Sequence, residues 1–72
     1  MSKLKTKIFF INGAPYKYSS NFTINSLISY LGFNKKTIVV DYNGFIIEKE
    51  LWNKTEICTD DCIEVLSIAG GG

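Results

Sequence analysis

A single stretch of this sequence has a clear helical pattern, and this limits the folds that the chain can adopt. The pattern lies between Phe22 and Gly32. Its apolar residues recur at intervals of three and four, which places them on one helical face: Ile24, Leu27, Ile28 and Leu31. Thr23 is suited to cap the start of this helix, and Gly32 is suited to the left-handed conformation that ends one. A chain with one amphipathic helix can form a core by laying that helix across a sheet.

The other apolar segments are short and are separated by turn residues, as strands are. The predicted strands cover residues 4–11, 16–20, 36–42, 45–47 and 62–67. Asn12-Gly13 and Asn43-Gly44 indicate tight turns, because both residue types tolerate a positive φ. The segment from Glu48 to Trp52 fits a single helical turn with Leu51 or Trp52 pointing inward.

This order of elements predicts a two-layer α+β domain. The connection through the helix is long enough to make strands 16–20 and 36–42 parallel neighbours. We therefore expect a β-grasp domain, with a mixed four- to five-stranded sheet, one helix packed across it and the last strand inside the sheet. With 72 residues there is room for one small domain. We assign residues 1–67 to this domain and residues 68–72 to a flexible C-terminal glycine tail.

The tail ends in Gly70-Gly71-Gly72. Glycine has no side chain to bury and loses the most conformational freedom when it is ordered. A glycine tail can, however, enter a narrow site on another protein, because its backbone can approach a surface closely. The α-carboxylate of Gly72 is ionised at neutral pH, and it is the group that a partner could reach by this route.

The composition argues against several functions. A net charge of +1 is too small for a dedicated nucleic-acid binder, and no apolar run is long enough for a membrane span. The chain has no histidine to act as a general base and no phosphate-binding loop. Asp60, Asp61 and Glu64 are interpreted as solvated charges. The chain is therefore expected to be acted upon by enzymes, and not to be an enzyme.

Two cysteines, Cys58 and Cys62, lie four residues apart. This spacing is not that of a C-x-x-C redox motif, and two thiols without histidine do not make a zinc site. We interpret them as free structural thiols in a reducing compartment and expect no metal. All eight basic residues are lysines, a bias that suits an AT-rich bacterial or organellar genome. The expected location is the bacterial cytoplasm or the plastid stroma.

The last predicted strand has two different faces. Ile63 and Val65 share one face, and Leu66 and Ile68 share the other with Glu64. One helix cannot cover all of these apolar residues, and an exposed apolar patch suggests a protein partner. Leu66 and Ile68, together with the tail residues Gly70 and Gly71, are therefore predicted to bind a partner.

These features together resemble the ThiS family, the ubiquitin-like sulfur carriers of thiamine biosynthesis. The resemblance spans nearly the whole chain and includes Asn12-Gly13 after the first strand and the terminal glycines. It also includes a set of residues in the second half of the sequence: Asn43, Ile47, Lys49, Trp52, Asp61, Ile63 and Val65. Family members often have Pro-Arg where this chain has Glu48-Lys49, and they usually end in two glycines.

The resemblance implies a function for the C-terminal carboxylate. An E1-like adenylating enzyme of the ThiF type would use ATP and Mg²⁺ to join AMP to Gly72, or to Gly71 if the chain were trimmed. Sulfur would then replace AMP, and the resulting thiocarboxylate would donate sulfur to a thiazole synthase of the ThiG type. The carrier itself would bind no cofactor. Two alternatives stay open: the small subunit of molybdopterin synthase, and a β-grasp interaction module with an inert tail.

Overall fold

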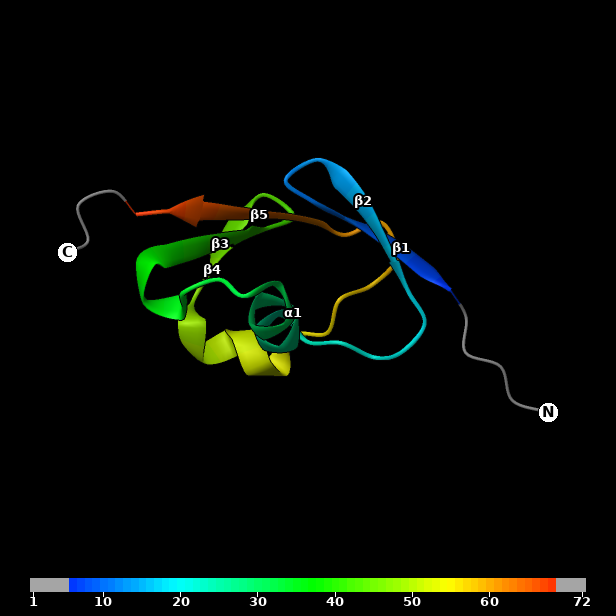
Figure 1. Ribbon diagram of the computed structural model, residues 1–72, viewed down its shortest axis with the longest axis horizontal. Helices are drawn as coiled ribbons and strands as arrows, with labels where there is room; N and C mark the ends of the chain where they lie inside the picture. The colour runs from blue at the N-terminus through cyan, green and yellow to red at the C-terminus, as the bar shows by residue number, and fades with distance from the viewer. Residues whose placement is uncertain (1–5, 69–72) are drawn as a thin grey trace.

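The computed structural model describes residues 6–68 of the chain. Five strands, one α-helix and two short 3₁₀ segments follow one another along it (Figure 1). They are β1 (Lys7–Ile11), β2 (Ala14–Tyr18), α1 (Ile24–Leu31), η1 (Lys35–Thr37), β3 (Ile38–Tyr42), β4 (Phe45–Ile47), η2 (Lys49–Lys54) and β5 (Cys62–Ser67). The predicted α+β class and the two layers are confirmed, with α1 and η2 on the same side of the sheet (Figure 1).

The five strands form one mixed sheet in the order β2-β1-β5-β3-β4. The last strand of the chain therefore lies at the centre, as expected. It runs parallel to β1 and antiparallel to β3. The predicted parallel pairing of the second and third strands is wrong, because β1 and β5 lie between them. The long connection through α1 carries the chain from β2 at one edge of the sheet to β3 on the other side of its centre. Strand β5, the last in the sequence, lies between β1 and β3.

Helix α1 begins and ends as its sequence predicts. The side chain of Thr23 accepts a hydrogen bond from the backbone N–H of Ser26 at 3.1 Å. Gly32 has φ 81°, and its N–H donates to the carbonyls of Ile28 and Ser29. The helix has eight residues, Ile24–Leu31, which lie between these two caps.

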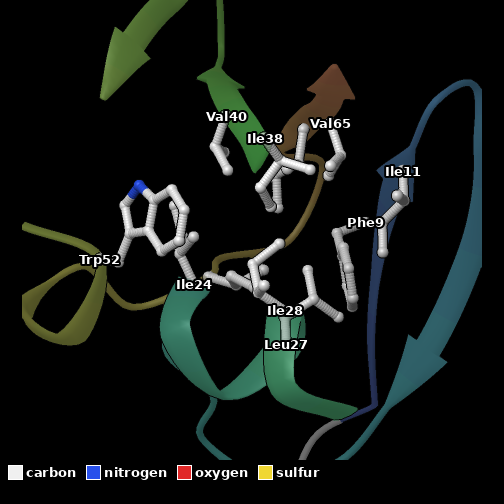
Figure 2. Packing of buried hydrophobic residues seen from close by; sticks show 11 residues of the cluster. Phe9, Ile11, Ile24, Leu27, Ile28, Ile38, Val40, Trp52 and Val65 are labelled. Atoms are coloured by element: carbon white, nitrogen blue, oxygen red, sulfur yellow. The ribbon is translucent and has the colours of Figure 1, made fainter. Parts of the chain in front are cut away.

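The core lies between α1 and the sheet, and Figure 2 shows its residues converging from both layers. Phe9 comes from β1, Leu27 and Ile28 from the helix, and Val40 from β3; each is 1% exposed or less. Trp52 closes the cluster on the side opposite β1 (Figure 2) and is 2% exposed. Leu51, its neighbour in η2, is 46% exposed, so Trp52 is the residue of the pair that points inward.

Several strand boundaries differ from the sequence prediction. Strand β1 starts at Lys7 and not at residue 4, and β2 ends at Tyr18 and not at residue 20. Strand β2 starts at Ala14, directly after the turn, and not at Tyr16. Strand β3 starts at Ile38, because Lys35–Thr37 form a 3₁₀ turn capped by the side chain of Asn34. Its Oδ1 accepts a hydrogen bond from the N–H of Lys36. The starts of β2 and β3 depend on local turn and capping bonds that a hydrophobic pattern does not contain.

Candidate functional site

The candidate site is the end of β5, where the folded body leads into the glycine tail. Five residue pairs align β5 with β3, from Tyr42 opposite Ile63 to Ile38 opposite Ser67. Beyond the strand, the N–H of Ile68 still donates to the carbonyl of Thr37 at 2.8 Å. The last described residue is therefore anchored to the body. Gly70, Gly71 and Gly72 lie outside the described residues, so their predicted roles and the domain boundary at residue 67 stay predictions.

Two asparagine side chains hold β5 from either side. Oδ1 of Asn12, in the β1–β2 turn, accepts a hydrogen bond from the N–H of Val65 at 2.9 Å. Oδ1 of Asn43, in the β3–β4 turn, accepts one from the N–H of Cys62 at 2.7 Å. Both asparagines have positive φ, 50° and 53°, which aims their side chains back at the central strand. The sequence indicated the two turns but not these contacts. The only hint of them in the sequence is that both turns begin with an asparagine, whose side chain can accept a backbone hydrogen bond.

Asp61 fixes the loop that leads into β5. It is 8% exposed and accepts three hydrogen bonds: from the Tyr42 hydroxyl at 2.6 Å, from Asn43 Nδ2 at 3.0 Å and from the Cys58 N–H at 2.7 Å. The interpretation of Asp61 as a solvated charge is therefore wrong, whereas Asp60 and Glu64 are exposed as expected. A buried carboxylate with three donors is structural, because its oxygen atoms are already occupied.

This arrangement changes the acidity of two tyrosines. Burial, then the hydrogen bond to Asp61 and its charge, raise the pKa of Tyr42 far above 10.0. Burial raises the pKa of Tyr18 as well, and the nearby Cys58 and Asp61 add to this shift. The Tyr18 hydroxyl donates to the carbonyl of Ile57 at 2.7 Å. Both tyrosines are thus kept neutral as hydrogen-bond donors and are not poised to act as bases.

The predicted division of the two faces of β5 is confirmed. Ile63 and Val65 are 1% and 9% exposed and point into the core, whereas Leu66 and Ile68 are 45% and 44% exposed. Val39 of β3 lies opposite Leu66 on the same outer face. The end of β5 that adjoins the tail therefore presents an apolar surface on the side of the sheet away from the helix.

The described residues contain little else that could carry out chemistry. Cys58 and Cys62 are exposed and unpaired. Residues 6–68 contain no cluster of three or more side chains able to hold a metal ion. None of the described helices is long and apolar enough to cross a membrane. What the body offers is a central strand that is hydrogen-bonded on both sides and has an apolar outer face next to the tail in sequence.

Comparison with known proteins identifies relatives along almost the whole chain. Residues 10–72 match the ThiS family. The sulfur carrier protein ThiS of Bacillus subtilis is 33% identical over 63 residues, which cover 86% of this chain and 96% of that protein. A protein of Trieres chinensis named Uncharacterized protein ycf40 is 41% identical over 73 residues, with both chains fully covered.

A solved structure has the same fold. The crystal structure of a thiamine biosynthesis protein (ThiS) from Geobacter metallireducens superposes with a TM-score of 0.78 and 26% identity. The match covers 90% of this chain and 99% of that one. The ubiquitin-like β-grasp fold expected from the sequence is therefore confirmed.

Another match is to part of a larger protein. A chain named thiazole synthase from Magnetococcus marinus is 29% identical over 62 residues. These residues make up 86% of the present chain but 19% of that protein. A segment similar to this domain is thus joined covalently to a longer chain in that bacterium.

Proposed function

The chain belongs to the ThiS family, the sulfur carriers of thiamine biosynthesis, and from this we propose that it carries sulfur as a thiocarboxylate on its terminal glycine. A carrier of this kind is a small protein and not a catalyst. The observation that supports the proposal most is the position of β5. It is the central strand, it is held on both sides, and it leads directly to Gly70-Gly71-Gly72.

The chemistry follows from the weakness of a carboxylate as an acyl donor. In the proposed first step, the Gly72 carboxylate attacks the α-phosphorus of ATP, and pyrophosphate leaves. The resulting acyl-adenylate has AMP as a good leaving group. Hydrosulfide then attacks the acyl carbon, AMP leaves, and the product is the thiocarboxylate. An adenylating partner of the ThiF type would bind ATP and Mg²⁺, because positioning and charge stabilisation by protein groups and metal ions drive phosphoryl chemistry.

The folded body would contribute position. The hydrogen bonds from Val65 to Asn12 and from Cys62 to Asn43 fix β5 relative to both halves of the sheet. Leu66 and Ile68 would dock on the partner by their exposed apolar side chains. A rigid body docked next to the tail sets where the terminal carbon lies, and a misplacement of about 1 Å can cost about 10²-fold in rate.

Thiazole synthase is proposed as the protein that receives the sulfur. The covalent joining of a similar segment to a thiazole synthase in Magnetococcus marinus supports this pairing, because linkage raises the effective concentration of one partner at the other. The expected location is the bacterial cytoplasm or the plastid stroma, where thiols such as Cys58 and Cys62 stay reduced. The molybdopterin alternative has no specific observation in its favour among these relatives.

The proposal is tested by changing only the terminal group. A synthetic peptide of residues 62–72 begins with Cys62, and this cysteine allows the peptide to be ligated to residues 1–61. The chain can therefore be made with a carboxamide in place of the Gly72 carboxylate, or without Gly72. Loss of Gly72 withdraws the reacting carbon by up to ~3.6 Å. ATP–pyrophosphate exchange with the adenylating enzyme of the same organism should occur with the ligated natural sequence. It should be abolished by the carboxamide and slowed at least about 10²-fold by the deletion. Exchange by the carboxamide would refute the proposal.

A further inference from the structure

The pairing between β1 and β5 stops before β5 ends. Phe10 N–H donates to the carbonyl of Asp61, and Asn12 N–H donates to that of Ile63. The next bond of the ladder comes from the N–H of Val65, but its acceptor is the side chain of Asn12 and not a backbone carbonyl. At Asn12 and Gly13 the chain turns away into β2. Asn12 thus ends the ladder, and β5 continues past it (Figure 1).

The remaining part of β5 has one paired side and one open side. Backbone groups of successive strand residues point alternately to the two sides. On the β3 side, the N–H of Asn43 donates to the carbonyl of Cys62, and the N–H of Ile68 donates to the carbonyl of Thr37. The backbone groups of the even-numbered residues from Cys62 to Ile68 therefore point toward β3. The carbonyl of Val65 and the N–H of Ser67 therefore face the side that β1 has left. Within residues 6–68, no loop, turn or side-chain group is bonded to either of them, and the pairing of β1 with β5 ends at Ile11 opposite Ile63.

This open edge differs from the two outer edges of the sheet. Strand β2 carries Pro15 and Lys17, and both residue types discourage strand pairing at an edge. Strand β4 has only three residues. The open part of β5 has no proline or lysine, and its outward side chains are the exposed, apolar Leu66 and Ile68. It is a short segment with free backbone groups, without edge protection, directly before the tail.

We propose that this edge binds an extended strand of thiazole synthase, which pairs with Val65 and Ser67 and continues the sheet where β1 stops. The occupant must be extended backbone, because the free groups are one carbonyl and one N–H at strand spacing. The side chains of the bound strand that lie next to Leu66 and Ile68 should be apolar, because neighbouring side chains on adjacent strands pack against each other. The assignment to thiazole synthase rests on the proposed function.

The test removes one backbone donor. In Ser67→Pro the N–H is lost, while the ladder to β3 is kept because Ser67 does not donate to β3. The matched control is Lys17→Pro on the outer edge of β2. Lys17 lies between the hydrogen-bonding positions of the hairpin, so its N–H also points away from the sheet. We expect Ser67→Pro to bind thiazole synthase at least about fivefold more weakly than the natural chain, and Lys17→Pro to bind equally well.

A second measurement avoids substitutions that disturb folding. In the natural chain, hydrogen exchange of the Ser67 amide should be fast when the chain is free and slow when thiazole synthase is bound. The Lys17 amide should be unaffected by binding. A backbone ester at Ser67, introduced with the synthetic 62–72 peptide, should reproduce the loss of affinity without the proline ring.

The outcomes separate the two proposals. Equal affinities of Ser67→Pro and the natural chain, or a Ser67 amide that stays unprotected in the complex, would overturn the strand-pairing proposal and leave the carrier function intact. Protection of Ser67 in the free chain that grows with concentration would assign the edge to a second copy of the chain. A natural chain that takes up sulfur but forms no complex with thiazole synthase would overturn both the pairing and the assigned acceptor.

Discussion

Asp61 accepts hydrogen bonds from three segments of the chain: β3, the β3–β4 turn and the loop before β5. We predict that Asp61→Asn lowers the free energy of unfolding by about 1–3 kcal/mol, since an amide group then faces donors that need an acceptor. Asp60→Asn is the matched control, because Asp60 is exposed and asparagine tolerates its φ of 70°. Urea unfolding measures both. Equal stability of the two variants would show that the Asp61 contacts do not hold the loop.

Tyr42, the partner of Asp61, should make stability fall at high pH. Its pKa is raised above 10.0, so the folded chain keeps the phenol proton where the unfolded chain loses it. The stabilisation is therefore complete below about pH 10 and is lost as the pH rises from there. Unfolding free energies measured between about pH 9 and 11 should decline more steeply for the natural chain than for Tyr42→Phe. Tyr30→Phe is the control, because Tyr30 is 75% exposed; its stability should decline with pH as steeply as that of the natural chain. If the stability of Tyr42→Phe declines equally steeply, Tyr42 is not the source of the pH dependence.

At the scale of elements, helix α1 is the main packing surface for the sheet. Leu27 is 1% exposed, so Leu27→Ala should lower the free energy of unfolding by about 2–5 kcal/mol through lost burial and a residual cavity. Ser29→Ala, on the exposed side of the same helix, should change it by less than about 0.5 kcal/mol. Thermal or urea unfolding tests both. A loss at Leu27 no larger than that at Ser29 would mean that the helix face is wrong.

The elements also show how far sequence reasoning reaches. The helix, its two caps and both Asn-Gly turns were predictable, because each depends on residues close together in the chain. The two faces of β5 were predictable from alternation. The burial of Asp61 and the contacts of Asn12 and Asn43 were not. Their partners, up to 53 positions away for Asn12, are brought together only by the order of strands in the sheet.

At the scale of the whole molecule, the chain is a body that presents a reactive end to partners. We predict that Leu66→Asp weakens binding to the adenylating enzyme at least about tenfold, because a charge would enter an apolar contact. Leu51→Asp is the control: Leu51 is 46% exposed, close to the 45% of Leu66, but lies in η2. Both variants should stay folded, with changes of about 1 kcal/mol or less. Equal binding by the two would show that the outer face of β5 is not the docking surface.

The mass of the intact chain tests the central claim most directly. The chain is incubated with its adenylating enzyme, ATP, Mg²⁺ and a sulfur donor, alongside a Cys58→Ser, Cys62→Ser variant. We predict that both chains gain the mass difference between sulfur and oxygen, and that fragmentation places it on Gly72. A gain that occurs only in the chain with cysteines, or that fragmentation places on Cys58 or Cys62, would contradict a carrier that holds its sulfur at the C-terminal carboxylate.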